Sequence, residues 1–212
     1  MRRLFHLQHS LPSVSAVLGR LGYNPKKTET SDWMWRIEKA IGEFSPFLEA
    51  RGIINTLRVV FRTDAMVTLE NGLTLNSTKL ASVLAQSEEV SLVAATLGQM
   101  IEEKLQYFLS SGEFTQATLL DAIASESIEH FVDWMQAIVA RERLRFAFSP
   151  TMRFSPGYGD WKLDIQPEIL RVLKAEEIGL SVHPESYILL PEKSITAVIG
   201  WEKNKKEIPG QK

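Results

Sequence analysis

The sequence predicts an α+β fold, in which a curved and largely antiparallel sheet packs against helices, one of them long. Segments rich in β-branched residues between 52 and 75, and again between 180 and 201, alternate in polarity or flank tight turns, as antiparallel strands do. Between them, residues 115–143 place apolar side chains at intervals of three and four. That spacing indicates one helix with a continuous buried face.

Length and composition narrow the functional classes. The 212 residues suffice for one core, so we expect a single domain over residues 1–212, with flexible ends at about 1–12 and 202–212. A net charge of −2 without a basic stripe argues against nucleic acid as a partner. No apolar run reaches the roughly 18 residues that a membrane span needs, and we expect a cytoplasmic protein with no membrane partner.

The side chains that usually hold metals are scarce. The chain has no cysteine, which excludes a disulfide framework, a thiolate metal site, an iron–sulfur cluster and a cysteine nucleophile. Its four histidines stand in no recognised ligand spacing. We therefore expect no metal site.

The N-terminal quarter predicts two helices. Residues 13–22 form the first, and the second begins at Ser31 or Asp32, either of which is a good N-cap. Trp33 and Trp35 follow at once in this second helix. They are candidates for stacking on a flat ligand, although aromatic residues on an amphipathic helix more often belong to the core.

The next segment predicts strands and a tight hairpin. Residues 56–61 are β-branched and alternating, and Asn71-Gly72 is the favoured pair for a two-residue turn between 67–69 and 73–75. Ser77 then caps a short helix that ends at about residue 85. Residues 90–95 are apolar without alternation, which is typical of a strand that is buried on both faces.

The second half of the chain alternates helices with short strands. Predicted helices cover 99–109, 115–143 and 164–174, and predicted strands cover 145–148, 180–182, 187–190 and 194–201. Along the long helix, polar residues recur every fourth position at Asp121, Ser125, Glu129 and Asp133. They share one strip of surface. This strip is either a solvated flank or the border of a ligand site.

Residues 153–161 combine turn formers with reactive side chains. Pro156-Gly157 predicts a type II turn, and a second glycine at Gly159 permits close approach of a ligand to the backbone. A guanidinium, a phenol, a carboxylate and an indole lie within the same nine residues. Residue types alone leave two interpretations open, an ordinary surface connection or a binding loop.

The order of these residues resembles a known motif. Arg153, three further residues and Gly157-Tyr158 resemble the S-adenosylmethionine-binding motif of the reactivation domain of cobalamin-dependent methionine synthase. The resemblance covers about residues 88–201. Its other blocks are Ile128-Glu129-His130-Phe131, Pro184-Glu185-Ser186 and Pro191-Glu192-Lys193-Ser194.

The resemblance implies a set of site residues. Arg153 would clamp the methionine carboxylate, because its planar fork donates two charge-assisted hydrogen bonds. The backbone of residues 154–157 would contact adenine, and Tyr158, the implied catalytic residue, would lie beside the sulfonium or the corrin. Asp32 is a candidate partner for the ligand amino group. The residues implied to bind S-adenosylmethionine are Arg153, Phe154, Ser155, Pro156, Gly157, Tyr158, Glu129 and Glu185.

The resemblance also implies partners. The chain lacks the Asp-x-His-x-x-Gly motif that supplies the lower ligand of cobalamin, so cobalamin is expected on a separate methionine synthase chain. A flavodoxin-like or ferredoxin-like protein would supply one electron, and this chain would be inactive without its cobalamin partner. Two alternatives stay open: a non-catalytic docking module for a corrinoid protein, or S-adenosylmethionine binding for another methyl acceptor.

Overall fold

The computed structural model describes residues 1–8, 10–23 and 31–204, without the side chains of residues 31 and 32. Its α-helices are α1 (Val14–Arg20), α2 (Ser31–Phe44), α3 (Thr78–Val83), α4 (Met100–Ser110), α5 (Phe114–Leu144) and α6 (Gln166–Leu173). Its strands are β1 (Arg2–Gln8), β2 (Glu49–Arg62), β3 (Met66–Leu69), β4 (Thr74–Asn76), β5 (Ser87–Thr96), β6 (Phe148–Pro150), β7 (Ser181–Val182), β8 (Leu189–Leu190) and β9 (Ser194–Lys203). Short 3-10 helices cover Ser45–Phe47, Leu163–Ile165 and Ala175–Ile178.

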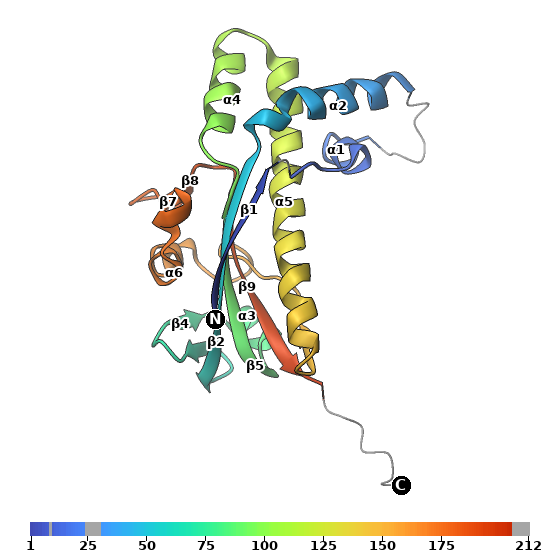
Figure 1. Cartoon of the computed structure of the whole chain (residues 1–212). Coiled ribbons are helices and arrows are strands. Elements are labelled where there is room, and N and C mark those ends of the chain that lie inside the picture. Colours follow the sequence, from blue (N-terminus) through green and yellow to red (C-terminus); the bar gives the residue numbers. More distant parts are fainter. Residues whose placement is uncertain (9, 24–30, 205–212) are drawn as a thin grey trace.

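One antiparallel sheet organises the fold, in the order β4-β3-β2-β5-β9-β6. β1 pairs with the first half of β2, and β3 pairs with its second half, with a register shift between Val59 and Phe61 inside this pairing. β7 and β8 form a separate two-stranded ribbon. The predicted α+β class, antiparallel sheet and long helix are confirmed (Figure 1).

The N-terminal end differs from its prediction. We expected residues 1–12 to be flexible, but Arg2–Gln8 forms β1, and its Phe5 is buried. The N-terminal amine also donates to the carbonyl of Thr56 at 2.6 Å. β2 extends to Glu49, seven residues before the predicted strand begins, because β1 and β5 pair with this first half from both sides. At the other end, 202–203 belong to β9, and 205–212 lie outside the described residues.

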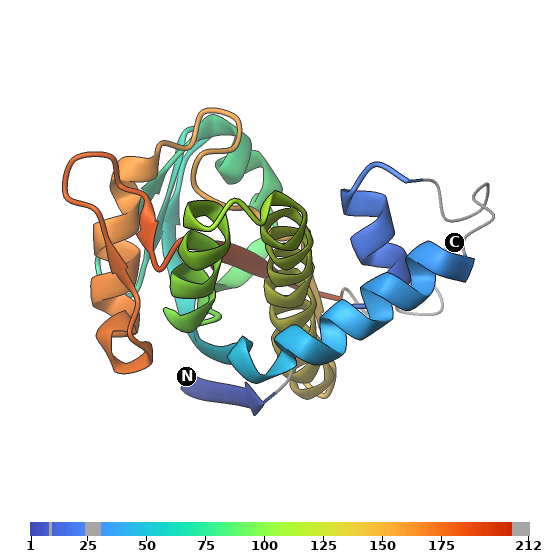
Figure 2. The ribbon, with the colours of Figure 1, turned by 90° about the horizontal axis from the view of Figure 1, so that it is seen from above.

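Two apolar cores lie on opposite faces of the sheet, so the molecule has three layers. α1, α2, α4 and α5 cover one face, whereas α3 and α6 cover the other (Figures 1 and 2). β5 supplies Val93 and Ala95 to the first core and Leu92 and Ala94 to the second. The largely apolar run at 90–95 therefore marks a strand covered on both faces, as predicted.

The long helix α5 packs across the sheet at close range. A Cβ added at Gly52 of β2 would lie 2.4 Å from the Sδ atom of Met135, so glycine is required for this approach unless the methionine moves. The buried residues of α5 recur at the predicted spacing, among them Ile128, Phe131 and Met135.

Local signals at several turns are confirmed. Gly72 has a φ of 86°, as the hairpin turn after Asn71 requires, and Ser77 accepts a hydrogen bond from the N–H of Leu80 at 3.0 Å. The strand predicted at 145–148 is shifted to Phe148–Pro150, because the chain turns at Ala147 with a φ of 61°.

Candidate functional site

The segment after β6 is held against the edge of β9. Phe154 and Val198 exchange backbone hydrogen bonds of 3.0 and 2.8 Å, and the N–H of Thr151 donates to the carbonyl of Gly200 at 2.9 Å. Successive side chains of an extended segment point to opposite faces. Arg153 accordingly faces α5, whereas Phe154 packs against the second core beside Trp161, with 6.1 Å between their ring centroids.

Arg153 is bound by two carboxylates of α5. Its Nη1 donates to Oδ1 of Asp133 at 2.9 Å, and its Nη2 donates to Oε2 of Glu129. The two acids are four residues apart, so they lie one above the other on the helix. The arginine side chain is 20% exposed, that of Glu129 43% and that of Asp133 70%. Two of the residues predicted for the site, Arg153 and Glu129, are thus in direct contact.

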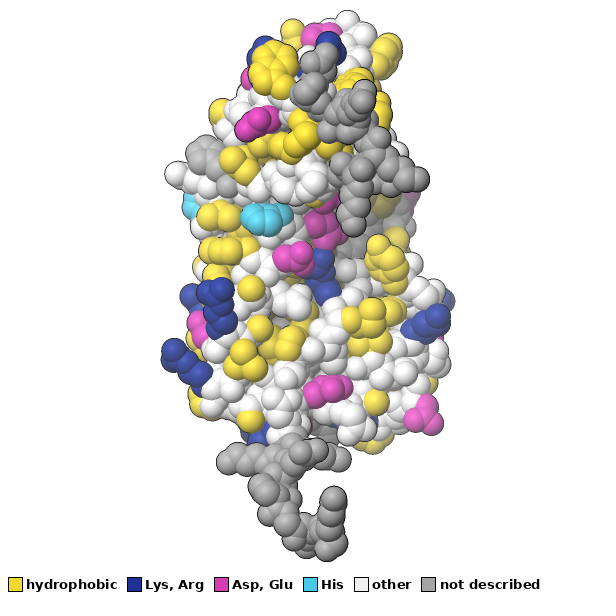
Figure 3. All heavy atoms as spheres, turned by 90° about the vertical axis from the view of Figure 1, so that its right-hand side faces the viewer, with side chains coloured by type: hydrophobic (Ala, Val, Ile, Leu, Met, Phe, Trp, Pro, Cys, Tyr) yellow, Lys and Arg dark blue, Asp and Glu magenta, His cyan; other side chains and the backbone are white. Residues whose placement is uncertain are grey.

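The remainder of the polar strip on α5 is paired as well. Nζ of Lys193 lies 2.6 Å from Oδ1 of Asp121 and 2.9 Å from Oγ of Ser125. All four members of the strip therefore face cations carried by the segments beside β9. Figure 3 shows acidic and basic side chains side by side on the face where α1, α2 and α5 lie. The strip therefore lies between α5 and the segments beside β9, and its acids Asp121 and Asp133 are also exposed to solvent, at 56% and 70%.

The loop itself forms the predicted type II turn. The N–H of Tyr158 donates to the carbonyl of Ser155 at 3.3 Å, and Gly157, at the third position of the turn, has a φ of 93°. The N–H of Gly157 donates to the carbonyl of Trp161 at 2.7 Å. Of the N–H groups considered for adenine, those of Phe154 and Gly157 are therefore already engaged, and Pro156 has none.

Tyr158 projects away from the protein. Its side chain is 69% exposed, and its hydroxyl has no hydrogen-bond partner among the described residues. Met152, one residue before Arg153, is 68% exposed. Both side chains are open to a ligand or to a partner surface.

Asp160 anchors the loop, a role that the sequence analysis missed. Its carboxylate accepts from the hydroxyls of Ser77 and Thr78, both at 2.5 Å, and from the N–H groups of Thr78 and Lys79 at 2.7 and 3.2 Å. These bonds, first of all the one from Ser77, hold the pKa of Asp160 well below its usual value. The Ser77-Thr78 pair of hydroxyls at a helix start was the available signal, since both are free to donate to an acid.

Two candidate residues are not joined to this cluster. Glu185 is exposed in the turn between β7 and β8, beside α6 and on the face opposite α5 (Figure 1). Its N–H donates to Nδ1 of His183 at 3.3 Å. The side chain of Asp32, the candidate for the amino group, lies outside the described residues.

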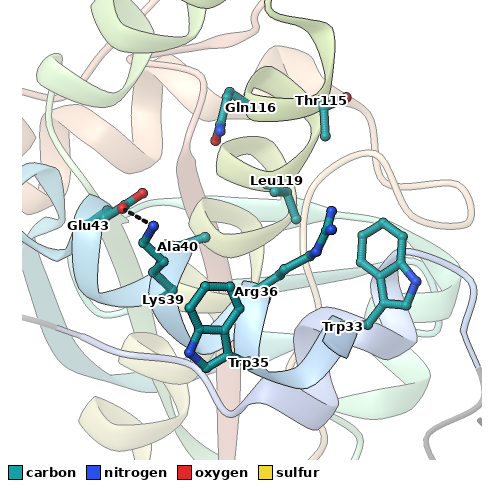
Figure 4. Close-up of a pocket in the computed structure, with 9 residues that line it drawn as sticks. All are labelled: Trp33, Trp35, Arg36, Lys39, Ala40, Glu43, Thr115, Gln116 and Leu119. Carbon is teal, nitrogen blue, oxygen red and sulfur yellow. Dashed lines mark ion pairs between the residues drawn. The ribbon is translucent and has the colours of Figure 1, made fainter. Parts of the chain in front are cut away.

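The tryptophans of α2 line a different hollow. Trp33, Trp35 and Arg36 surround a space of about 250 Å³ between α2 and the first turns of α5, with Leu119 at its α5 side (Figure 4). Ten residues of α5, roughly 15 Å of helix, separate Leu119 from Glu129. The structure therefore does not bring the tryptophans to Arg153.

The described part of the chain holds no group of three or more His, Asp or Glu side chains placed to bind a metal ion. None of the described helices is long and apolar enough to cross a membrane.

Comparison with known proteins supports the fold. No family model matches the sequence, and no curated protein matches it. Among solved structures, the MetH reactivation domain bound to AdoHcy (S-adenosylhomocysteine) is similar, with a TM-score of 0.72 over 97% of this chain and 80% of that one. The sequence identity is 13%, so the shared property is the arrangement of helices and strands.

Proposed function

We propose that this chain binds S-adenosylmethionine and supports the reductive remethylation of cob(II)alamin on a separate cobalamin-binding methionine synthase chain. One observation carries the proposal. The motif residues Arg153, Gly157 and Tyr158 occur in a fold similar to that of a reactivation domain whose solved structure holds AdoHcy. Arg153 also contacts Glu129, an acid that the sequence resemblance selected as well.

The chemistry of the cluster suits this ligand. S-adenosylmethionine carries a carboxylate, an ammonium and a sulfonium, and the cluster offers one guanidinium and the two carboxylates that are paired with it. A guanidinium recognises a carboxylate through two parallel bonds, and carboxylates attract both cations. Tyr158 presents an open aromatic face and a hydroxyl next to the turn.

In this proposal the chain positions the methyl group of S-adenosylmethionine for transfer. A flavodoxin-like or ferredoxin-like protein would supply the electron that reduces the partner's cobalt. The sulfonium would then transfer its methyl group to this cobalt, and AdoHcy would be the product. Such a transfer depends on holding the methyl in line with its acceptor and on keeping water away. Arg153 suits this task because the pairing of Phe154 with β9 fixes its backbone.

Titration calorimetry tests the binding step. The chain should bind S-adenosylmethionine and AdoHcy and should not bind hydroxocobalamin. In a second assay, the absorbance change from cob(II)alamin to methylcobalamin is followed with a cobalamin-loaded partner, a one-electron reductant and S-adenosylmethionine. This change should depend on the chain and be absent without the partner.

The outcomes separate the alternatives. Failure to bind S-adenosylmethionine refutes the proposal. If the chain binds S-adenosylmethionine but the remethylation rate is the same with and without it, the ligand serves another methyl acceptor. If the chain associates with the corrinoid partner but does not bind S-adenosylmethionine, it is a docking module.

A further inference from the structure

We infer that the Arg153–Asp133 ion pair exchanges partners when an amino-acid ligand binds. In this exchange the ligand's α-carboxylate replaces Asp133 on the guanidinium, and the released Asp133 carboxylate takes the ligand's α-ammonium group. The inference rests on the proposed function, because it concerns the amino-acid end of S-adenosylmethionine. It gives Asp133 the amino-group role for which Asp32, whose side chain lies outside the described residues, was the candidate from the sequence.

The geometry selects Asp133 as the partner that leaves. Nη1 of Arg153 donates to Asp133 and Nη2 donates to Glu129, so a ligand carboxylate that takes these two nitrogens in a fork competes with the two acids. Asp133 is the more exposed, 70% against 43% for Glu129. Exposed ion pairs contribute little to stability, so opening this one costs little.

The charges of the ion pair match those of an amino-acid head group. Arg153 and Asp133 neutralise each other at 2.9 Å. An amino-acid head group is a zwitterion, whose anion matches the arginine and whose cation matches the aspartate. Inserting it between the two protein charges yields four alternating charges. Each charge then keeps an opposite neighbour.

The formal charges of the side chains and the ligand also predict a preference between substrate and product. With one cation and two anions, Arg153, Glu129 and Asp133 carry a formal charge of −1. S-adenosylmethionine carries +1 at neutral pH, whereas AdoHcy, which lacks the sulfonium, carries no net charge. The filled site is neutral with the methyl donor and remains at −1 with the product. Electrostatics therefore favours replacement of product by substrate.

A second ion pair on the same helix provides a control. Asp121 pairs with Lys193 at 2.6 Å in the same strip, twelve residues or roughly 18 Å of helix from Asp133. It has the same chemistry without contact to Arg153. Asp121→Asn should remove an ion pair of the same kind and leave ligand affinity unchanged.

The experiment uses Asp133→Asn with two truncated ligands and titration calorimetry. Decarboxylated S-adenosylmethionine keeps the ammonium, and its affinity should fall about five- to tenfold because its acceptor is lost. The deaminated analogue keeps the carboxylate, and its affinity should rise about two- to fivefold because Arg153 is released. Asp133→Glu, which keeps the charge, should retain the wild-type order of the two ligands.

Opposite signs for the two ligands are the diagnostic result. A change in the same direction for both, or no change, in a protein whose wild type binds S-adenosylmethionine overturns the exchange and leaves the proposed function standing. A wild type that binds none of the three ligands overturns both. Thermal unfolding of each variant, expected to match the wild type at this exposed position, confirms that the comparison is made between folded proteins.

Discussion

Phe154 and Val198 exchange both of their backbone hydrogen bonds, although Phe154 belongs to no regular strand. This isolated bridge ties the loop to the central sheet one residue after Arg153. The guanidinium therefore projects toward α5 from a backbone that is as firmly placed as β9 itself. A ligand that binds Arg153 meets an arginine whose position is fixed before binding, which reduces the entropy lost on association.

Replacing Arg153 with alanine should weaken S-adenosylmethionine binding by about 1.5–3 kcal/mol, because charge-assisted hydrogen bonds to the carboxylate are lost. Calorimetric titration measures the change. Arg171→Ala is the matched control, since Arg171 forms an exposed ion pair with Glu168 on α6, away from α5. Equal affinity for S-adenosylmethionine in both variants would show that Arg153 does not bind the ligand.

Replacing Tyr158 with phenylalanine should leave the fold and S-adenosylmethionine affinity close to wild type and slow remethylation of the partner's cobalamin. The phenol is exposed and its hydroxyl bonds to no described residue, so nothing in the folded chain depends on it. The conversion rate at saturating ligand is the measurement. Tyr107→Phe, at another exposed tyrosine, should not change the rate, and a rate unchanged at position 158 as well contradicts a catalytic role.

Replacing Gly157 with alanine should destabilise the protein by about 1–3 kcal/mol, because a side chain is strained at a φ of 93°. The new Cβ would also lie 3.2 Å from Cδ2 of Leu163. Denaturant unfolding gives the free energy. Gly19→Ala, in α1 with nothing within 4 Å of the added carbon, should be neutral or stabilising. Similar unfolding free energies in the two variants would show that the turn tolerates a side chain.

Asp160 predicts a specific pH dependence of stability. Its pKa is lowered from 3.8 in the folded state, chiefly by the hydrogen bond from Ser77, so its stabilising contribution is complete above about pH 4 and is lost as the pH falls further. Asp160→Asn should lower the melting temperature at neutral pH. The gap to wild type should then narrow below about pH 4. Asp164→Asn, at an exposed acid close in sequence, is the control, and a gap independent of pH contradicts the anchoring role.

Local chemistry explains what the sequence predicted correctly. The turn at Pro156-Gly157, the hairpin after Asn71 and the Ser77 cap each depend on residues within a few positions of one another. The long helix follows from apolar spacing that any helix must bury. The similar solved structure confirms the predicted fold, and Arg153 and Glu129 prove to be in contact.

Long-range pairing explains what the sequence did not predict. β1 is held by contacts with residues about fifty positions away, so its own polar sequence gave no sign of a strand. The capture of Asp160 by Ser77 spans 83 positions and depends on how the loop crosses the sheet edge. Glu185 was selected by resemblance alone, and the fold places it beyond the opposite face.

The two-sided burial of β5 has a consequence for how the protein opens. Val93 and Leu92 are neighbours in the chain but belong to different cores, so neither core can separate from this strand without breaking hydrogen bonds that align the other. The helices on both faces are thereby coupled into one cooperative unit. Amide hydrogens in the middle of β5 should exchange with solvent only when the whole molecule unfolds. Those in the Tyr158 turn can exchange through local opening that leaves both cores intact.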